Sequence, residues 1–295
     1  MIPYVRELDF EYGRADQVSP LIRRVIANNP SPFTFKGTGT YIVGQGETAV
    51  IDPGPDDPAH LEAILAALGG ETVKTILITH DHSDHAPLAA ALAKRTGAPI
   101  VGARPSPPRA VVPGTEEGST RGYHPDRILT DGEVVSGPGW TLTTVATPGH
   151  TANHLCYALK EENALFCGDH VMGWSTTVIV PPDGSMTDYY ASLRKVMDGH
   201  YTTLWPTHGP PITDPQPFVQ AYLDHRLKRE GQLVEVLANG PANIPDLVSR
   251  LYIGLDPRLN RAAGASLLAH LNHLVREGVA AHDEGGQLER LYWLV

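Results

Sequence analysis

Short apolar runs alternate with longer amphipathic stretches along most of the chain. Residues 76–78, Ile-Leu-Ile, are an example of the apolar runs. A short continuous aliphatic stretch of this kind predicts a buried strand. Residues 58–69 are an example of the amphipathic stretches. Leucine and isoleucine recur there at helical spacing, which predicts a helix that Gly69-Gly70 ends. Strands that alternate with helices predict an α/β fold.

The same patterns place further elements before residue 210. The predicted strands are residues 33–35, 40–43, 48–51, 76–78, 99–101, 140–147, 155–159, 164–167 and 203–205, and the predicted helices are residues 58–69, 86–95 and 188–197. Glycine turns separate the first three strands, which predicts an antiparallel sheet edge, and residues 155–167 predict a hairpin. Residues 104–122, rich in proline and glycine, predict a long loop. This order favours an αββα sandwich, two sheets between helices.

The last part of the chain follows a different pattern. Residues 218–237 predict a long helix that Gly240-Pro241 ends. Two shorter helices, residues 244–251 and 261–276, precede two short strands around residues 278–281 and 290–294, which is the order of a winged helix. The sequence therefore predicts a catalytic αββα domain over residues 1–215. A linker helix and a small winged-helix-like α+β domain would follow over residues 216–295.

Composition narrows the class of protein. The chain has 295 residues and a formal net charge of −10, which argues against a polyanionic partner unless bound metal ions add positive charge at the site. No stretch approaches the roughly 20 apolar residues that span a bilayer, and the N-terminus lacks the apolar core of a secretory signal. The two cysteines, Cys156 and Cys167, lie in apolar segments typical of buried thiols. We expect a cytoplasmic protein with no membrane partner.

A polar cluster follows the strand at residues 76–78. His80, His82, Asp84 and His85 lie within six positions directly after it. Ligands usually bind at the carboxyl edge of an α/β sheet, which is where this cluster is expected. Burying these groups without partners would cost about 2–7 kcal/mol each, so a purely structural explanation is weak.

Three later strand ends repeat the pattern with a histidine or an aspartate. The complete set of candidate ligands is His80, His82, Asp84, His85, His150, Asp169 and His208. Imidazole and carboxylate together favour zinc or a similar first-row ion. Seven ligands exceed the three or four of one catalytic zinc, so two zinc ions bridged by Asp169 are expected, with manganese and iron as alternatives.

Other residues are weaker candidates. His154, four positions after His150, is expected to be a hydrogen-bond partner, and His170 is expected to belong to the scaffold or the pocket rim. Trp174 and Tyr189 are interpreted as core aromatics, with a place in a pocket as the alternative. The isolated histidines are expected at the surface or in packing: His60, His124, His200, His225, His270, His273 and His282.

The motif His-x-His-x-Asp-His at residues 80–85, together with Thr-Pro-Gly-His, Cys-Gly-Asp-His and Pro-Thr-His-Gly further along, resembles the metallo-β-lactamase superfamily. The resemblance implies two metal sites that share a bridging Asp169. His80, His82 and His150 would hold the first ion, and Asp84, His85 and His208 the second. It also implies that Asp52 supports the ligands from behind without binding metal.

A closer resemblance is to the lactamase-β-2-like branch of that superfamily, whose known member is a single-strand endoribonuclease. Segments 29–34, 37–41, 147–154 and 161–166 carry it. Two positions depart from that branch. Gly39 stands where the branch usually has asparagine, and His170 stands where its known member has cysteine. Neither residue belongs to the ligand set, so the departures concern the choice of substrate.

The implied reaction is hydrolysis by a hydroxide held between two zinc ions, with Asp84 orienting the hydroxide or passing its proton to the leaving group. The branch resemblance favours phosphodiester cleavage in single-stranded RNA. The alternative is a carbonyl hydrolase: a thioesterase similar to glyoxalase II, a lactonase or a promiscuous β-lactamase. A non-enzymatic winged-helix regulator is disfavoured by the complete ligand set. Expected partners are a small-molecule or single-stranded nucleic-acid substrate, and a homodimer through the C-terminal domain stays open.

Overall fold

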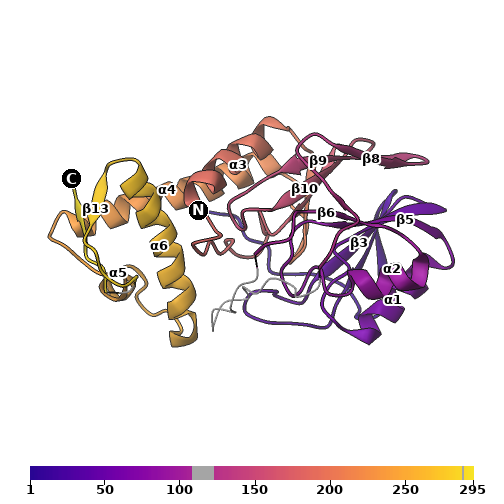
Figure 1. Ribbon diagram of the computed structural model, residues 1–295, viewed down its shortest axis with the longest axis horizontal. Helices are drawn as coiled ribbons and strands as arrows, with labels where there is room; N and C mark the ends of the chain where they lie inside the picture. The colour runs from indigo at the N-terminus through magenta and orange to yellow at the C-terminus, as the bar shows by residue number, and fades with distance from the viewer. Residues whose placement is uncertain (108–122, 288) are drawn as a thin grey trace.

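A computed structural model of the chain describes residues 1–107, 123–287 and 289–295. The larger part consists of two sheets packed face to face between layers of helices, and the smaller C-terminal part lies to one side (Figure 1). Within the described residues, no helix is both long and apolar enough to cross a membrane.

Among the described residues, the first sheet has seven strands in chain order. They are β1 (Ala15–Ser19), β2 (Ile22–Ile26), β3 (Gly39–Val43), β4 (Glu47–Ile51), β5 (Thr72–Ile78), β6 (Ile100–Gly102) and β7 (Arg127–Ile128). Strands β1 to β4 pair antiparallel, which confirms the predicted antiparallel edge, and β4 to β7 pair parallel. Helices α1 (Pro58–Leu68) and α2 (Ala89–Thr96) cover the outer face of this sheet.

The second sheet has the order β12-β11-β10-β9-β8. Its strands are β8 (Val134–Gly137), β9 (Trp140–Ala146), β10 (Leu155–Leu159), β11 (Ala164–Gly168) and β12 (Thr203–Pro206). The predicted hairpin is present, because β10 and β11 pair antiparallel, whereas β11 and β12 run parallel. Helices α3 (Met186–Asp198) and α4 (Pro215–Leu237) pack on the outer face through a shared apolar cluster. The predicted αββα sandwich is therefore confirmed.

The core between the sheets comes from the alternating inward side chains of both. Tyr41 and Leu77 of the first sheet meet Tyr157 and Phe166 of the second in one buried cluster. The rings of Tyr41 and Phe166 lie 5.1 Å apart between centroids. Packing the sheets this closely brings the ends of their strands to one edge of the sandwich.

The C-terminal part contains α5 (Ile244–Leu251), the short 3₁₀ helix η1 (Pro257–Leu259), α6 (Asn260–Arg276), and the paired strands β13 (Ala280–His282) and β14 (Tyr292–Leu294). This confirms the predicted helices and hairpin. The cluster that forms its core includes Leu233 and Leu237 from the end of α4, whereas Phe218 and Tyr222 of the same helix pack against the second sheet. Helix α4 thus contributes to both cores.

Some predicted elements differ from the structure. Residues 33–35 form a turn instead of a strand, because the hydroxyl of Ser31 accepts hydrogen bonds from the amides of Phe33 and Thr34 and Phe35 adopts a positive φ of 59°. The helix predicted from residue 86 begins at Ala89, after Pro87. Strands β1, β2, β7 and β8 were not predicted as strands. Residues 108–122 of the predicted long loop lie outside the described residues.

Candidate metal centre

The nine predicted site residues meet at one edge of the sandwich, and all nine are buried. Each follows the end of a strand or the turn after it. Asp52 follows β4, the segment from His80 to His85 follows β5, His150 and His154 lie between β9 and β10, Asp169 follows β11 and His208 follows β12. The first sheet therefore supplies one half of the cluster and the second sheet the other.

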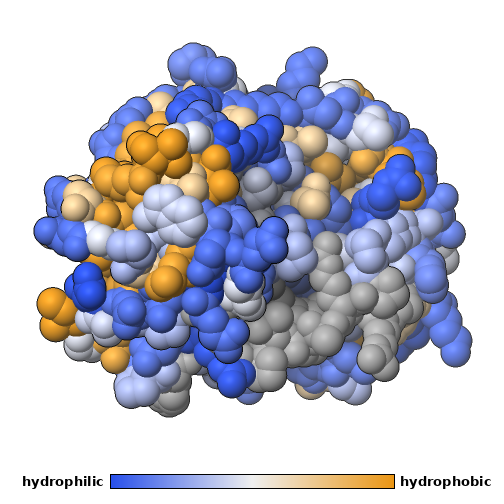
Figure 2. Space-filling model, turned by 60° about the vertical axis from the view of Figure 1, so that its left-hand side comes forward, coloured by the Kyte–Doolittle hydropathy of each residue, from blue (hydrophilic) through white to orange (hydrophobic). Residues whose placement is uncertain are grey.

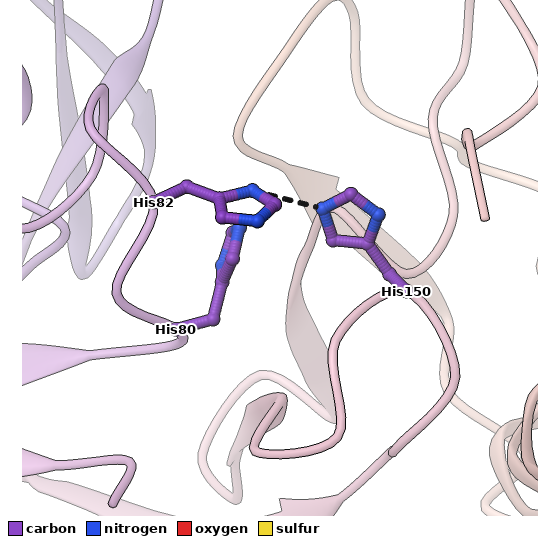
Figure 3. A group of neighbouring side chains, drawn as sticks. All are labelled: His80, His82 and His150. Carbon is purple, nitrogen blue, oxygen red and sulfur yellow. Dashed lines mark hydrogen bonds between the residues drawn. The ribbon is translucent and has the colours of Figure 1, made fainter. Parts of the chain in front are cut away.

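The first group of ligand atoms comes from His80, His82 and His150 (Figure 3). These atoms lie within 4.8 Å of one another, and Nε2 of His150 is 3.3 Å from Nδ1 of His82. Nδ1 of His150 donates to the carbonyl of Val178 at 2.7 Å, which leaves its Nε2 as a lone-pair donor facing the other two rings. This is a geometry suited to one metal ion.

The second group consists of Asp84, His85 and His208. Oδ2 of Asp84 lies 3.1 Å from Nε2 of His208 and 3.4 Å from Nε2 of His85. Nδ1 of His208 donates to the carbonyl of Gly37 at 3.2 Å, so its Nε2 faces the centre. Gly37 has a φ of 135°, and a Cβ there would lie 2.0 Å from the carbonyl oxygen of Ala27, so only glycine can bring this carbonyl to the site.

Asp169 lies between the two groups. Its Oδ2 is 3.5 Å from Nε2 of His85 and 3.4 Å from Nε2 of His208 in the second group. It is also 3.8 Å from Nε2 of His150 in the first. The structure thus brings together all seven candidate ligands, with Asp169 in the position of a bridge.

Four of the inward-facing atoms have no hydrogen-bond partner among the described residues. They are Nε2 of His80, Nε2 of His85, Nε2 of His208 and Oδ1 of Asp169, all buried. A buried polar atom without a partner costs about 1–3 kcal/mol, which cations coordinated by these atoms would offset. The donor set, five imidazoles and two carboxylates, matches first-row divalent ions. The residues present therefore fit a dinuclear metal centre.

The electrostatics of the two groups differ. Burial lowers the pKa of His82 to about 3, with His150 adding to the effect, and burial also holds the pKa of His80 well below its usual range. Burial alone would lower the pKa of His208, but the carboxylates of Asp169 and Asp84 outweigh it and raise the pKa to about 10. Burial therefore favours the neutral, metal-binding form of the first group, whereas the carboxylates beside His208 favour its protonated form, with which a metal ion would compete.

Asp52 lies behind the second group. Its carboxylate accepts hydrogen bonds from the amide and the hydroxyl of Thr79 at 2.8 and 2.7 Å, and from Nδ1 of His85 at 2.9 Å. It therefore holds both the end of β5 and the ring of His85. Asp52 itself has a positive φ of 47°, a conformation that this set of bonds stabilises.

His154 and His170 are not among the residues whose ligand atoms group together. Nδ1 of His154 lies 2.8 Å from the hydroxyl of Thr147, and its Nε2 accepts from the amide of Asp169 at 3.2 Å. The ring thus positions the backbone of Asp169. His170 is fully buried and packs edge-on against Tyr189, whose ring centroid is 5.0 Å away, so His170 belongs to the scaffold.

Sequence patterns did not identify Thr38 as a site residue. Its buried hydroxyl lies 3.3 Å from Oδ2 of Asp84, to which it donates, and its amide donates to Asn29 at 2.9 Å. The signal was weak, because threonine is common and Thr38 lies 46 positions before its partner.

Helix α4 also holds one wall of the site. The hydroxyl of Tyr222 lies 3.1 Å from the amide and 2.8 Å from the carbonyl of Met172, and Arg226 donates to the carbonyl of Thr177. Thr177 in turn donates to the carbonyl of Asp169 at 2.8 Å. Tyr222 and Arg226 are four positions apart on α4, so their spacing in the sequence places both on one helix face. The sequence does not identify the loop that they contact.

A small pocket of about 50 Å³ opens over the metal centre. His82, His150 and Asp169 form its floor, and its walls include Pro32, Phe33, Met172, Trp174 and Val178. Trp174 therefore lines a pocket, and it also stacks on Phe35 with 4.9 Å between centroids. Tyr189 lies in the core, as expected.

Two family models match the chain. Residues 34–208 match the Metallo-beta-lactamase superfamily, and residues 244–287 match the Beta-lactamase associated winged helix domain. The chain is 32% identical to a "Beta-lactamase-like protein 2 homolog" of Caenorhabditis elegans, covering 95% of this chain and 91% of the relative. It is 34% identical to an "Atrochrysone carboxyl ACP thioesterase" of Aspergillus fumigatus, covering 80% of this chain and 75% of the relative.

Solved structures share the fold over nearly the whole length. A beta-lactamase domain protein from Burkholderia ambifaria superposes with a TM-score of 0.80 at 20% identity, covering 100% of this chain and 97% of that chain. A metallo-beta-lactamase family protein from Thermus thermophilus gives a TM-score of 0.76 at 25% identity, covering 94% of this chain and 100% of that chain.

Proposed function

Because the chain belongs to the metallo-β-lactamase superfamily and is a metal-dependent hydrolase, we propose that it hydrolyses a thioester at a dinuclear centre. The observation that carries the proposal is the wall of the pocket over that centre. Carbon-rich side chains such as Phe33, Met172 and Val178 surround the metal ligands, and the described residues that line this pocket include no lysine or arginine.

An apolar wall suits a neutral acyl group. A phosphodiester within a nucleic acid carries a negative charge at every nucleotide, and proteins usually contact such backbones with lysine and arginine. A relative that is 34% identical and is named an ACP thioesterase supports the same choice of substrate. Both arguments favour the carbonyl hydrolase over a nuclease.

We propose two zinc ions as the occupants, with manganese or iron as alternatives. When bound, such ions would polarise the substrate carbonyl and supply an ionised water near neutral pH. His80, His82 and His150 would hold one ion, and Asp84, His85 and His208 the other, with Asp169 shared.

Asp84 has a second proposed role. The hydroxyl of Thr38 and the ring of His208 orient its carboxylate. From that position Asp84 would accept the proton of the attacking water and return it to the departing thiolate. Pro32 and Trp174, which both line the pocket, would restrict bulk water around the acyl group.

Cleavage of single-stranded RNA is the second candidate. The winged-helix match at residues 244–287 favours it, because such domains often contact nucleic acids, and the sequence resembles a branch with an endoribonuclease. The net charge of −10 and the apolar pocket weigh against it.

A substrate panel separates these candidates. The zinc-loaded protein would be assayed with acyl thioesters, S-lactoylglutathione, a homoserine lactone, nitrocefin and a single-stranded RNA. We expect kcat/KM to be highest for a thioester and to reach at least about 10⁴ M⁻¹s⁻¹, the lower end of typical enzymes. Cleavage of the RNA with every thioester left intact would overturn the proposal. Metal analysis of the same sample should find two ions per chain, and one or none would contradict a dinuclear centre.

A further inference from the structure

Resting on the proposed function, we propose that the groove between the catalytic part and the C-terminal domain binds the acyl chain of the thioester. The groove lies between helices α5 and α6 on one side and residues 180–181 on the other. Its volume is about 660 Å³, whereas the pocket over the metal ligands holds only about 50 Å³. Ligand pockets commonly span about 300–1,000 Å³, so the groove has room for the part of a substrate that the smaller pocket excludes.

One short segment of the chain contributes to the lining of both cavities. Residues 176–180 contain no turn or bend, and Ile179 is fully buried in the core of the catalytic part. Side chains alternate along an extended chain, so Val178 and Val180 face the side opposite to Ile179. Val178 lines the pocket at the metal ligands and Val180 lines the groove. Two residues of extended chain span about 7 Å, which places the cavities next to each other.

The lining of the groove fits a hydrocarbon chain. Its walls include Val180, Pro181, Ile244, Val248, Leu255 and Leu268. The polar residues that border it include Ser249, Asn260, Arg261 and Gln287, which are exposed and so lie toward solvent, and Arg261 is the one charged residue among the described lining. No aspartate or glutamate is among the described residues of the lining. Figure 2 shows apolar side chains gathered on the side of the molecule where the C-terminal domain lies.

An acyl chain bound in this way gives the reaction a dependence on chain length. N-acetylcysteamine thioesters from acetyl to decanoyl would be compared in kcat/KM. We expect an increase of about fourfold for each added methylene beyond the reach of the small pocket, the gain from burying one CH₂ group. A flat profile would overturn the groove proposal while leaving thioester hydrolysis in place.

Filling the groove should remove this dependence. Ala265 lies on α6 in the groove lining, so Ala265→Trp should lower kcat/KM for the decanoyl thioester at least tenfold and leave the acetyl thioester unchanged. Asn272→Trp is the matched control, because Asn272 is exposed on the same helix and outside the groove. Ser249→Trp, at an exposed position of the lining, repeats the test in case Ala265→Trp does not fold.

A binding measurement separates this inference from the proposed function. Decanoate binding would be followed by titration calorimetry, with Ala265→Trp expected to weaken it at least tenfold and Asn272→Trp to leave it unchanged. If no thioester is hydrolysed but decanoate binds in this Ala265-dependent way, the proposed function fails and the groove remains an acyl site. If decanoate does not bind, or binds all variants equally, the groove proposal is wrong.

A second copy of the chain in the groove is the competing occupant. Sedimentation of the wild type and of Ala265→Trp at equal concentration tests it. An unchanged oligomeric state is expected. Conversion of a dimer to a monomer by Ala265→Trp, with decanoate binding intact, would assign the groove to a subunit contact and overturn the proposal.

Discussion

Three of the candidate ligand imidazoles are each oriented by a hydrogen bond from Nδ1, the ring nitrogen that faces away from the centre. Nδ1 of His85 donates to Asp52, Nδ1 of His150 to the carbonyl of Val178 and Nδ1 of His208 to the carbonyl of Gly37. In each case Nε2 is left to face the centre. Such bonds fix the tautomer of the ring, so the geometry of the centre is present before a metal ion binds.

Asp84→Asn tests the proposed catalytic residue. The amide keeps the shape of the carboxylate but cannot accept the water's proton, so we expect kcat to fall by about 10²–10⁴, the range for general acid–base catalysis. Asp81→Asn is the control within the same motif, because Asp81 bonds Ser106 and Asn153 instead of the metal ligands. We expect its kcat to fall far less. Full activity in Asp84→Asn, with the fold verified by circular dichroism, would exclude the proposed role.

Helix α4 links the two domains and also supports the site. Its first half packs on the second sheet, its second half enters the C-terminal core, and Tyr222 and Arg226 hold the loop that carries Met172 and Thr177. That loop forms a wall of the pocket and presents the carbonyl of Val178 to His150. The position of His150 therefore depends on helix α4, which contributes no candidate ligand itself.

Tyr222→Phe tests this support. The change removes the hydroxyl that bonds the backbone of Met172, and we expect a loss of about 1–3 kcal/mol in the free energy of unfolding. Because the pocket wall loosens, we also expect kcat/KM to fall about tenfold while the metal content stays unchanged. Denaturant unfolding, kinetics and metal analysis measure the three quantities.

Tyr190→Phe is the matched control for this variant. Its hydroxyl is bonded to Glu230 at 2.7 Å, away from the loop, so a similar loss of stability should leave kcat/KM near the wild-type value. An equal loss of activity in both variants would mean that stability alone explains the effect of Tyr222→Phe.

At the scale of the whole molecule, the candidate metal centre lies where the two sheets meet. His80, His82, Asp84 and His85 follow β5 of the first sheet, whereas His150, Asp169 and His208 follow strands of the second. Without cations, four buried atoms at this junction have no hydrogen-bond partner among the described residues. The ions should therefore stabilise the fold as well as supply chemistry.

Metal removal measures that contribution. Ligand at 1,000 times its Kd stabilises a folded protein by about 4 kcal/mol, which for a domain of this size corresponds to about 10 °C in Tm. We expect chelation to lower Tm by that order and zinc, but not magnesium, to restore it, since imidazoles bind magnesium poorly. An unchanged Tm after verified removal of the ions would contradict a stabilising role.

Much of the site could be predicted because each ligand is a distinctive residue directly after an apolar strand. Asp84 and Asp169 are found this way with no knowledge of their neighbours. The segment Phe33-Thr34-Phe35 alternates like a strand and is predicted as one, whereas the hydrogen bonds of the Ser31 hydroxyl fold it into a turn. Strand β2 was missed because it carries Arg23 and Arg24, and Arg24 is buried beside Asp16 of β1 at 3.6 Å.

The sequence by itself determined the class of fold, the ligand types and hence the metal chemistry, because these follow from local hydrophobic patterns and from the chemistry of single side chains. Only the tertiary structure decided which atoms face one another, how Thr38, Tyr222 and Arg226 support the site, and where the two cavities lie. The hydrogen bonds of Thr38, Tyr222 and Arg226 join residues 46 to 50 positions apart, and such contacts are set by the packing of both sheets, helix α4 and the C-terminal domain.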